Sequence, residues 1–263
     1  MAVGRPRPVD RPDRQVGHER RLTLHRGGKL ATARHGHRAE RPPPQRPPGG
    51  YVQQLPMFPL GTVLFPHMVL PLHVFEPRYR ALMADVLAGD REFGVTLITR
   101  GHEVGGDDER ADVGTVARIV QAEEQDDGRW LVIAVGVRRV RIDRWLDDRP
   151  YPHAVVEDLP DGDDDAVLPA GLEARLRRVL AMHAELGFDG VPATFEVESD
   201  PSVACWQIAV VAPLTPFDAQ RVLATDGRGP RAALLDELLG DLEEVLGFQL
   251  SEDPEDTDDT TGP

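Results

Sequence analysis

Two hydrophobic periodicities divide the foldable part of this chain of 263 residues. From Leu55 to about Pro160, short runs rich in Val, Ile, Leu and Thr are separated by polar, Gly-bearing turns, which is the pattern of β-strands. Beyond residue 170 the apolar residues recur at the three-to-four-residue spacing of helices. Strands followed by helices predict an α+β fold.

The strand-rich part predicts a barrel with one early helix. The expected strands are 55–60, 69–75, 92–100, 113–123, 129–137, 138–146 and 151–158. Pro77 suits the first position of a helix, and apolar residues then recur at helical spacing until Gly89. Many short strands favour a closed or nearly closed β-barrel, since closure removes edges that would otherwise aggregate. The acidic, Gly-rich segment 101–114 is expected to form an exposed hairpin tip.

The second part predicts a bundle of about four helices over 170–247. An acidic linker at 161–169 separates it from the barrel region, 51–160. The four expected helices cover 170–186, a stretch that begins at Asp200-Pro201, another that begins at Thr215-Pro216, and 229–246. The second is apolar on nearly every side, so we expect it to be buried all round at the centre of the bundle. Residues 248–263 form an acidic tail that is too polar to fold.

Residues 1–50 differ from the rest in charge and composition. They carry a formal charge of +8, against −23 for the remainder, and are dense in Arg and Pro without Phe, Trp, Tyr or Ile. Such a segment buries too little apolar surface to offset chain entropy, so we predict that it is disordered. Three interpretations of this segment remain open. It is a basic arm that binds nucleic acid, a transit peptide, or an upstream sequence read in frame, in which case translation starts near Val52 or Met57.

Several enzyme classes are excluded by residue counts. The only lysine, Lys29, lies in the basic tail, so the folded part has no P-loop lysine, Schiff-base lysine or Ser-Lys dyad. The single cysteine, Cys205, rules out intrachain disulfides and multi-Cys metal sites, and favours a reducing cytoplasm. Placed in an apolar helix, it is expected to be buried with a raised pKa. Three acidic residues, 163–165, lack the ligand spacing of a calcium loop, so we expect neither metal nor cofactor.

Several segments carry a resemblance to a known family. LPMFPLGTVLFPHMVLPLHVFEPRYRALM, residues 55–83, resembles the opening of the N-terminal substrate-binding domain of Lon, the ATP-dependent protease. Further similar segments follow in the same order: GTVARIVQAEE at 114–124, GVRRVRI at 136–142, PYPHAVVEDLPD at 150–161 and APLTPFDAQRVLATD at 212–226. The resemblance implies a PUA-like barrel, a helical bundle and the binding of polypeptides. We expect a stand-alone domain without the ATPase and peptidase modules.

Two short segments are the candidate site residues. The turn of Phe65, Pro66, His67 and Met68 is the candidate peptide-binding patch, because a flexible Met on an exposed loop suits an apolar contact surface. Glu76, Pro77, Arg78 and Tyr79 are interpreted as a structural strand-to-helix corner. The residues expected to form barrel wall and core are Phe58, Pro59, Leu64, Phe65, Leu70, Leu72 and Phe75.

The favoured function is a non-catalytic module that binds unfolded or tagged polypeptides, with a separate ATP-dependent protease as a further partner. RNA binding is the alternative from another class. The negative charge of the folded part argues against RNA binding, because phosphate contacts need Lys and Arg. A basic ribbon is present, but its side chains point to both faces of a strand and have acidic neighbours; its members are Arg138, Arg139, Arg141 and Arg144. An enzyme of unrecognised type is the remaining alternative, and no membrane segment is expected.

Overall fold

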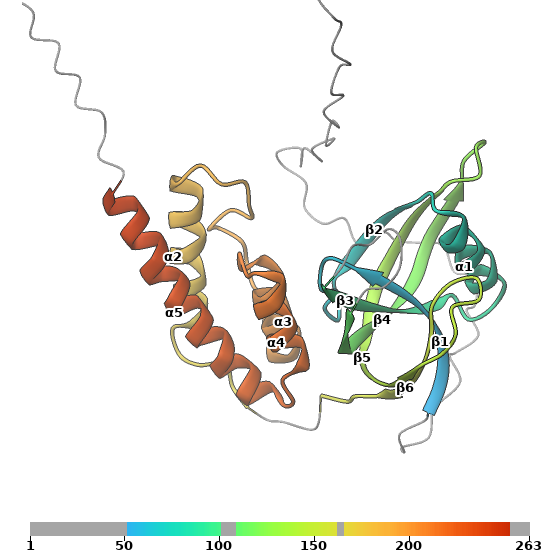
Figure 1. Ribbon diagram of the computed structural model, residues 1–263. Coiled ribbons are helices and arrows are strands. Elements are labelled where there is room, and N and C mark those ends of the chain that lie inside the picture. The colour runs from blue at the N-terminus through green and yellow to red at the C-terminus, as the bar shows by residue number, and fades with distance from the viewer. Residues whose placement is uncertain (1–51, 101–108, 162–165, 253–263) are drawn as a thin grey trace, which may run out of the picture. The chain divides into compact units, whose positions relative to one another are not determined.

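The computed structural model describes residues 52–100, 109–161 and 166–252 (Figure 1). The strands are β1 (Val52–Leu60), β2 (Val69–Val74), β3 (Glu92–Arg100), β4 (Glu109–Glu124), β5 (Trp130–Trp145) and β6 (His153–Asp158). The helices are α1 (Pro77–Ala88), α2 (Leu172–Glu185), α3 (Pro201–Val211), α4 (Pro216–Ala224) and α5 (Arg228–Glu252). The predicted α+β fold, a ring of strands with one early helix and then four helices, is confirmed. The predicted tail at 1–50 and the acidic residues 163–165 lie outside the described residues.

The six strands form one sheet that closes into a ring. Their order is β2-β5-β4-β3-β1-β6, and β6 also pairs with β5. β1 pairs in parallel with β3 through its C-terminal half and antiparallel with β6 through its N-terminal half. β5 pairs with β4 along most of its length, and on its other side it pairs first with β2 and then with β6. The ring is therefore β1-β3-β4-β5-β6, with β2 attached to one half of β5.

The two strands expected at 129–137 and 138–146 are one continuous strand, β5. The break was expected between residues 137 and 138. The strand contains Gly136, where a Cβ would overlap the carbonyl oxygen of Phe65, so this glycine allows a close backbone approach within the strand. β4 also begins earlier than predicted, at Glu109, so only residues 101–108 of the expected hairpin tip lie outside the described residues.

Helix α1 lies against the strands of the barrel (Figure 1). Its apolar face buries Leu82 and Met83 completely, in a cluster that includes Phe58 and Phe93. Tyr79 stacks on Phe58 with ring centroids 4.1 Å apart. Fully burying side chains of this size stabilises the fold by about 1.5–3 kcal/mol each.

Two residues that were expected in the barrel lie elsewhere. Phe75 is 55% exposed, because β2 ends at Val74 and the chain turns outward before α1. Phe65 is 3% exposed, but its cluster is that of the helices, where its ring centroid lies 5.7 Å from that of Trp206. The pattern of Leu and Phe residues in a sequence predicts that a side chain is buried, but it does not predict whether that side chain lies in the barrel core or in the core of the helices.

The predicted helix caps of α3 and α4 are confirmed. The Asp200 side chain accepts a hydrogen bond from the Ser202 N–H at 2.9 Å. The Thr215 hydroxyl oxygen accepts one from the Asp218 N–H at 3.1 Å. Caps of this kind contribute about 1 kcal/mol each.

Two predictions for the helical part are wrong in detail. α3 is not buried all round, because Val210 is 38% exposed. α5 continues to Glu252, so the first residues of the expected acidic tail are helical, and only 253–263 lie outside the described residues. The additional turns carry Phe248, which is 62% exposed.

The apolar core of the helices extends to residues of the barrel region. The cluster around Trp206 contains Val63 and Phe65 from the β1–β2 connection and Leu97 from β3. A buried guanidinium adds to this contact: Arg139 of β5 donates to the carbonyl of Leu223 in α4 at 2.9 Å. The β1–β2 connection is therefore held between strands and helices.

Candidate functional site

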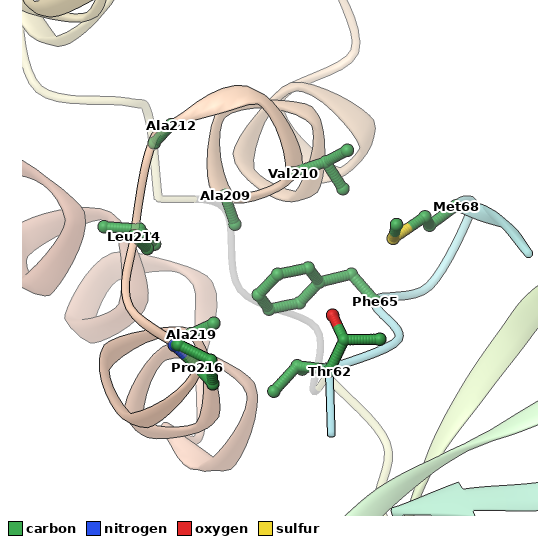
Figure 2. A pocket seen from close by; sticks show the side chains of 10 residues that line it. Thr62, Phe65, Met68, Ala209, Val210, Ala212, Leu214, Pro216 and Ala219 are labelled. Atoms are coloured by element: carbon green, nitrogen blue, oxygen red, sulfur yellow. The ribbon is translucent and has the colours of Figure 1, made fainter. Parts of the chain in front are cut away.

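The candidate site is an apolar cavity of about 120 Å³ between the β1–β2 connection and the helices α3 and α4. We call it the loop–helix groove. Its lining residues are Thr62, Val63, Phe65, Met68, Ala209, Val210, Ala212, Leu214, Pro216 and Ala219. Figure 2 shows Phe65 pointing from the loop toward Ala209, with Met68 and Val210 beside it.

Backbone hydrogen bonds fix the loop that forms one wall of the groove. The N–H of His67 donates to the carbonyl of Gly136 at 2.8 Å, and the N–H of Gly136 donates to the carbonyl of Met68 at 2.9 Å. The hydroxyl of Thr115 donates to the carbonyl of Leu64 at 2.5 Å. His67 takes a positive φ of 65°, which is uncommon for a residue with a side chain and marks a tightly determined turn. The loop is therefore a rigid wall anchored on β4 and β5.

The four residues of the predicted peptide-binding patch fall into two groups. Phe65 and Pro66 are buried, and Phe65 anchors the loop among the helices. His67 is exposed, and Met68 is half-buried at the groove. Only His67 and Met68 can contact a ligand without rearrangement of the core.

The opposite wall comes from residues that sequence reasoning did not select. Val210, Leu214 and Pro216 line the groove from α3, the α3–α4 connection and the start of α4. Phe217 follows at the first turn of α4 and is 70% exposed. The signal available in the sequence was a phenylalanine directly after a helix-starting proline, and nothing local connects it with the turn at residues 65–68.

The predicted structural corner makes local contacts. Glu76 occupies the N-cap position of α1, but its side chain makes no capping hydrogen bond to a backbone N–H of the helix. Its carboxylate instead accepts a hydrogen bond from Arg78 Nε at 3.0 Å. The Arg78 guanidinium lies 4.5 Å from the ring centroid of Tyr79, which is itself buried. Pro77 takes the first helical position, as expected.

The residues that the structure describes contain no cluster of three or more His, Cys, Asp or Glu side chains that could hold a metal ion. Cys205 is buried, and burial raises the pKa of its thiol to about 11, as predicted. None of the helices in the described part combines the length and apolar character needed to cross a bilayer.

Each arginine of the predicted basic ribbon has a carboxylate partner. Arg138 contacts Glu92 at 2.7 Å and Asp158 at 2.8 Å. The other three arginines form four ion pairs: Arg139 with Asp161 and with Asp226, Arg141 with Asp226, and Arg144 with Asp143. Burial alone would raise the pKa of Glu92, but hydrogen bonds and charges from Arg118 and Arg138 outweigh it and hold that pKa below its usual range. The ribbon therefore presents little free positive charge.

Fold and groove together define a class: a small barrel with an early helix, joined to four helices around an apolar core. Solved structures of this kind include the Lon N-terminal domain protein from Xanthomonas campestris, with a TM-score of 0.52 and 28% identity. The match covers 72% of this chain and 98% of that one. The N-terminal domain of the Lon protease of the Mycobacterium avium complex has the same fold, with a TM-score of 0.50 and 19% identity over 72% of this chain and 99% of that one.

Residues 54–240 match the family model of the ATP-dependent protease La (LON) substrate-binding domain, and the chain belongs to this family. Relatives include the Lon protease of Trichlorobacter lovleyi, 29% identical over 74% of this chain, and Lon protease 2 of Myxococcus xanthus, 31% identical over 74%. The match covers 25% and 24% of those two proteins. The chain thus spans about a quarter of the length of these relatives.

Proposed function

We propose that this chain is a non-catalytic polypeptide-binding module that recognises unfolded or tagged proteins. The loop–helix groove carries the proposal, because it is an open apolar cavity with Met68 and Val210 accessible at its rim. Its volume of about 120 Å³ suits one apolar side chain, since apolar cavities of similar size accept benzene. Exposed apolar patches of this kind mark interaction sites in folded proteins.

Membership of a family described as a substrate-binding domain supports the same function. We further propose that the chain acts as an adaptor in protein quality control and passes bound polypeptides to a separate ATP-dependent protease. No cofactor is needed for this function, because binding uses apolar contacts and main-chain hydrogen bonds alone. The adaptor function predicts faster degradation of an unfolded protein by a Lon protease when this chain is added.

A binding titration tests the groove. The probe is fluorescein-labelled, reduced and carboxymethylated α-lactalbumin, which stays unfolded, and the measurement is fluorescence anisotropy. Val210→Asp, and His67→Asp combined with Met68→Asp, should each weaken binding about tenfold, because a charge replaces apolar contact area worth about 1.5 kcal/mol. Val167→Asp is the matched control, since Val167 is 81% exposed and lies outside the groove. Unchanged binding in both groove variants would refute the proposal.

RNA binding remains the alternative from another class, and no specific observation favours it. The four arginines of the basic ribbon are paired with carboxylates, and residues 51–263 carry a formal charge of −23. Phosphate contacts need unpaired Arg or Lys side chains. A salt-dependent mobility shift of RNA by residues 51–263 would reverse this ranking.

A further inference from the structure

One strand of the barrel has an open edge. β2 pairs with β5 and, among the strands that the structure describes, with no other. The remaining strands complete the ring, because β6 pairs with both β1 and β5. The second edge of β2 therefore presents backbone N–H and C=O groups that have no ladder partner within residues 52–100, 109–161 and 166–252. Such an edge is where an extended polypeptide can add a strand.

The ladder register shows which backbone groups face the open edge. The N–H of Gly136 donates to the carbonyl of Met68 at 2.9 Å, so the carbonyl of Met68 points toward β5, as at a hydrogen-bonded position of the ladder. Hydrogen-bonded pairs recur at every second residue of an antiparallel ladder. The residues of β2 bonded to β5 are thus Leu70, Leu72 and Val74, and those that turn their backbone groups away are Val69, Pro71 and His73.

Pro71 stands at a position where its missing N–H costs no bond to β5. The open edge consequently offers the N–H groups of Val69 and His73 and the carbonyls of all three outward-facing residues. The side chains of these three residues are exposed, so an incoming strand can approach the backbone without displacing buried groups.

A cavity of about 150 Å³ lies beside this edge. It is lined by Leu72 and Phe75 on the side of β2, and by Phe58 and Leu60 of β1, a strand with which β2 does not pair. Phe75 is 55% exposed at its rim. Side chains of an added strand alternate between two faces, so every second side chain would point toward this cavity. The cavity has room for one apolar side chain at a time.

The other face of an added strand also meets apolar surface. Val69 is 53% exposed and Leu131 of the neighbouring β5 is 46% exposed. His73 lies opposite Leu131 in the ladder, so both ends of the outward face of β2 are next to accessible aliphatic side chains. Apolar groups are therefore available on both sides of a strand that pairs with this edge.

We propose that the open edge of β2 is a second polypeptide-binding site, which takes an extended segment with apolar residues at alternate positions by strand addition. This proposal rests on the proposed function and deepens it, because it specifies the conformation and the spacing of the bound segment. Main-chain hydrogen bonds make such binding tolerant of sequence, and the cavity adds a preference for an apolar side chain.

Backbone variants test the edge directly. The probe is a fluorescein-labelled peptide of eight alternating Val and Thr residues with an Arg at each end, titrated by anisotropy. His73→Pro removes an N–H from the open edge, and His73→Ala is its matched control, because it changes the side chain and keeps the N–H. The proline variant should bind about fivefold more weakly than the alanine variant, the effect of one net hydrogen bond. Pro71→Val adds an N–H and should strengthen binding about fivefold.

Modified peptides test the same site without altering the protein. In an added strand, all N–H groups that face β2 belong to residues whose side chains share one face. N-methylation of all valines and N-methylation of all threonines should therefore weaken binding by different factors, at least fivefold apart. This measurement decides the question if a proline variant fails to fold.

The outcomes separate this proposal from the groove. If His73→Pro and His73→Ala bind the peptide equally, and the two methylated peptides also bind equally, the edge is not a binding site. The groove proposal still stands in that case if Val210→Asp weakens the binding of unfolded α-lactalbumin. Binding of α-lactalbumin without any binding of the alternating peptide likewise overturns the edge proposal alone. If the unmodified protein binds neither probe, both proposals fail. A dimer in sedimentation that His73→Pro dissociates would show that a second copy covers the edge, which also overturns the proposal.

Discussion

Asp161 is the shared counterion of two guanidinium groups that are almost completely shielded from water. The side chains of Arg139 and Arg231 are each 1% exposed, and Asp161 Oδ1 lies 2.9 Å from Arg139 Nε and 2.8 Å from Arg231 Nη2. The contact with Arg139 Nε is an ion pair without the alignment of a hydrogen bond. Trp206 Nε1 donates to Asp161 Oδ2 at 3.3 Å. Burial holds the pKa of Arg139 below its usual value, although the charge of Asp161 opposes this shift.

Asp161→Asn keeps the shape of the side chain and removes its charge. Stripping the counterion from a buried cation costs about 3–5 kcal/mol. We expect a smaller loss of about 2–3 kcal/mol, since the Asp161 side chain is 40% exposed and Asp226 still lies 3.3 Å from Arg139. The measurement is urea unfolding followed by tryptophan fluorescence. Asp147→Asn is the matched control, because its ion pair with Arg149 is exposed and contributes little.

A double variant identifies the cause of this loss. In the Asp161→Asn protein, Arg139 and Arg231 are like charges in a buried site, so Arg139→Met should restore part of the stability. We expect a coupling free energy of about 1–2 kcal/mol between Asp161 and Arg139. A loss below about 0.5 kcal/mol in Asp161→Asn, or additive effects in the double variant, would refute the reasoning.

Three further predictions concern buried positions. Gly136→Ala should lower the free energy of unfolding, measured in urea, by about 1–3 kcal/mol, because the added Cβ would overlap the carbonyl oxygen of Phe65. Gly89→Ala is the control, since a Cβ there has ordinary contacts at 3.6 Å, and an equal loss in both variants would contradict this prediction. The pKa of Glu92 is below 4.5 in the folded protein, so its stabilisation is present above that pH and lost as the pH falls through the folded-state value. The melting temperature should accordingly drop more steeply below pH 4.5 in the unmodified protein than in Glu92→Gln, and parallel curves would exclude this cause. The Cys205 thiol, with a pKa of about 11, should react with a thiol reagent at about pH 8 only in urea, and rapid labelling of the folded protein would contradict its burial.

Local signals in the sequence were sufficient for the order of the elements. A run rich in Val, Leu, Ile and Thr predicted β3 with its observed bounds, Glu92–Arg100. Asp200-Pro201 and Thr215-Pro216 predicted two helix starts, because cap hydrogen bonds and the fixed φ of proline depend only on neighbouring residues. The family resemblance, quoted over residues 55–83 and in later segments, is confirmed by the match to residues 54–240.

Features that depend on distant contacts were missed. The sequence predicted two strands, 129–137 and 138–146, where the structure has β5 alone, and only the approach of the Phe65 carbonyl shows why this strand contains Gly136. The apolar Val210 was expected in a core, but it lies at the rim of the loop–helix groove. The groove itself joins Met68 to α3 and α4, far away in the chain, and no local pattern pairs them. The open edge of β2 likewise follows from strand order, which periodicity does not specify.

The closure of the ring through β1 and β6 has a consequence for synthesis on the ribosome. Val52 pairs with Glu157, so β1 must wait until β6 has been synthesised before the hydrogen bonds of its N-terminal half can form. At about 5–20 residues per second, that delay is roughly 5–20 s. Pro56 and Pro59 interrupt the donor row of β1, which hinders pairing between nascent chains during this interval. Chaperone demand should therefore be highest before residue 158 has left the exit tunnel, and should fall once the sixth strand is available.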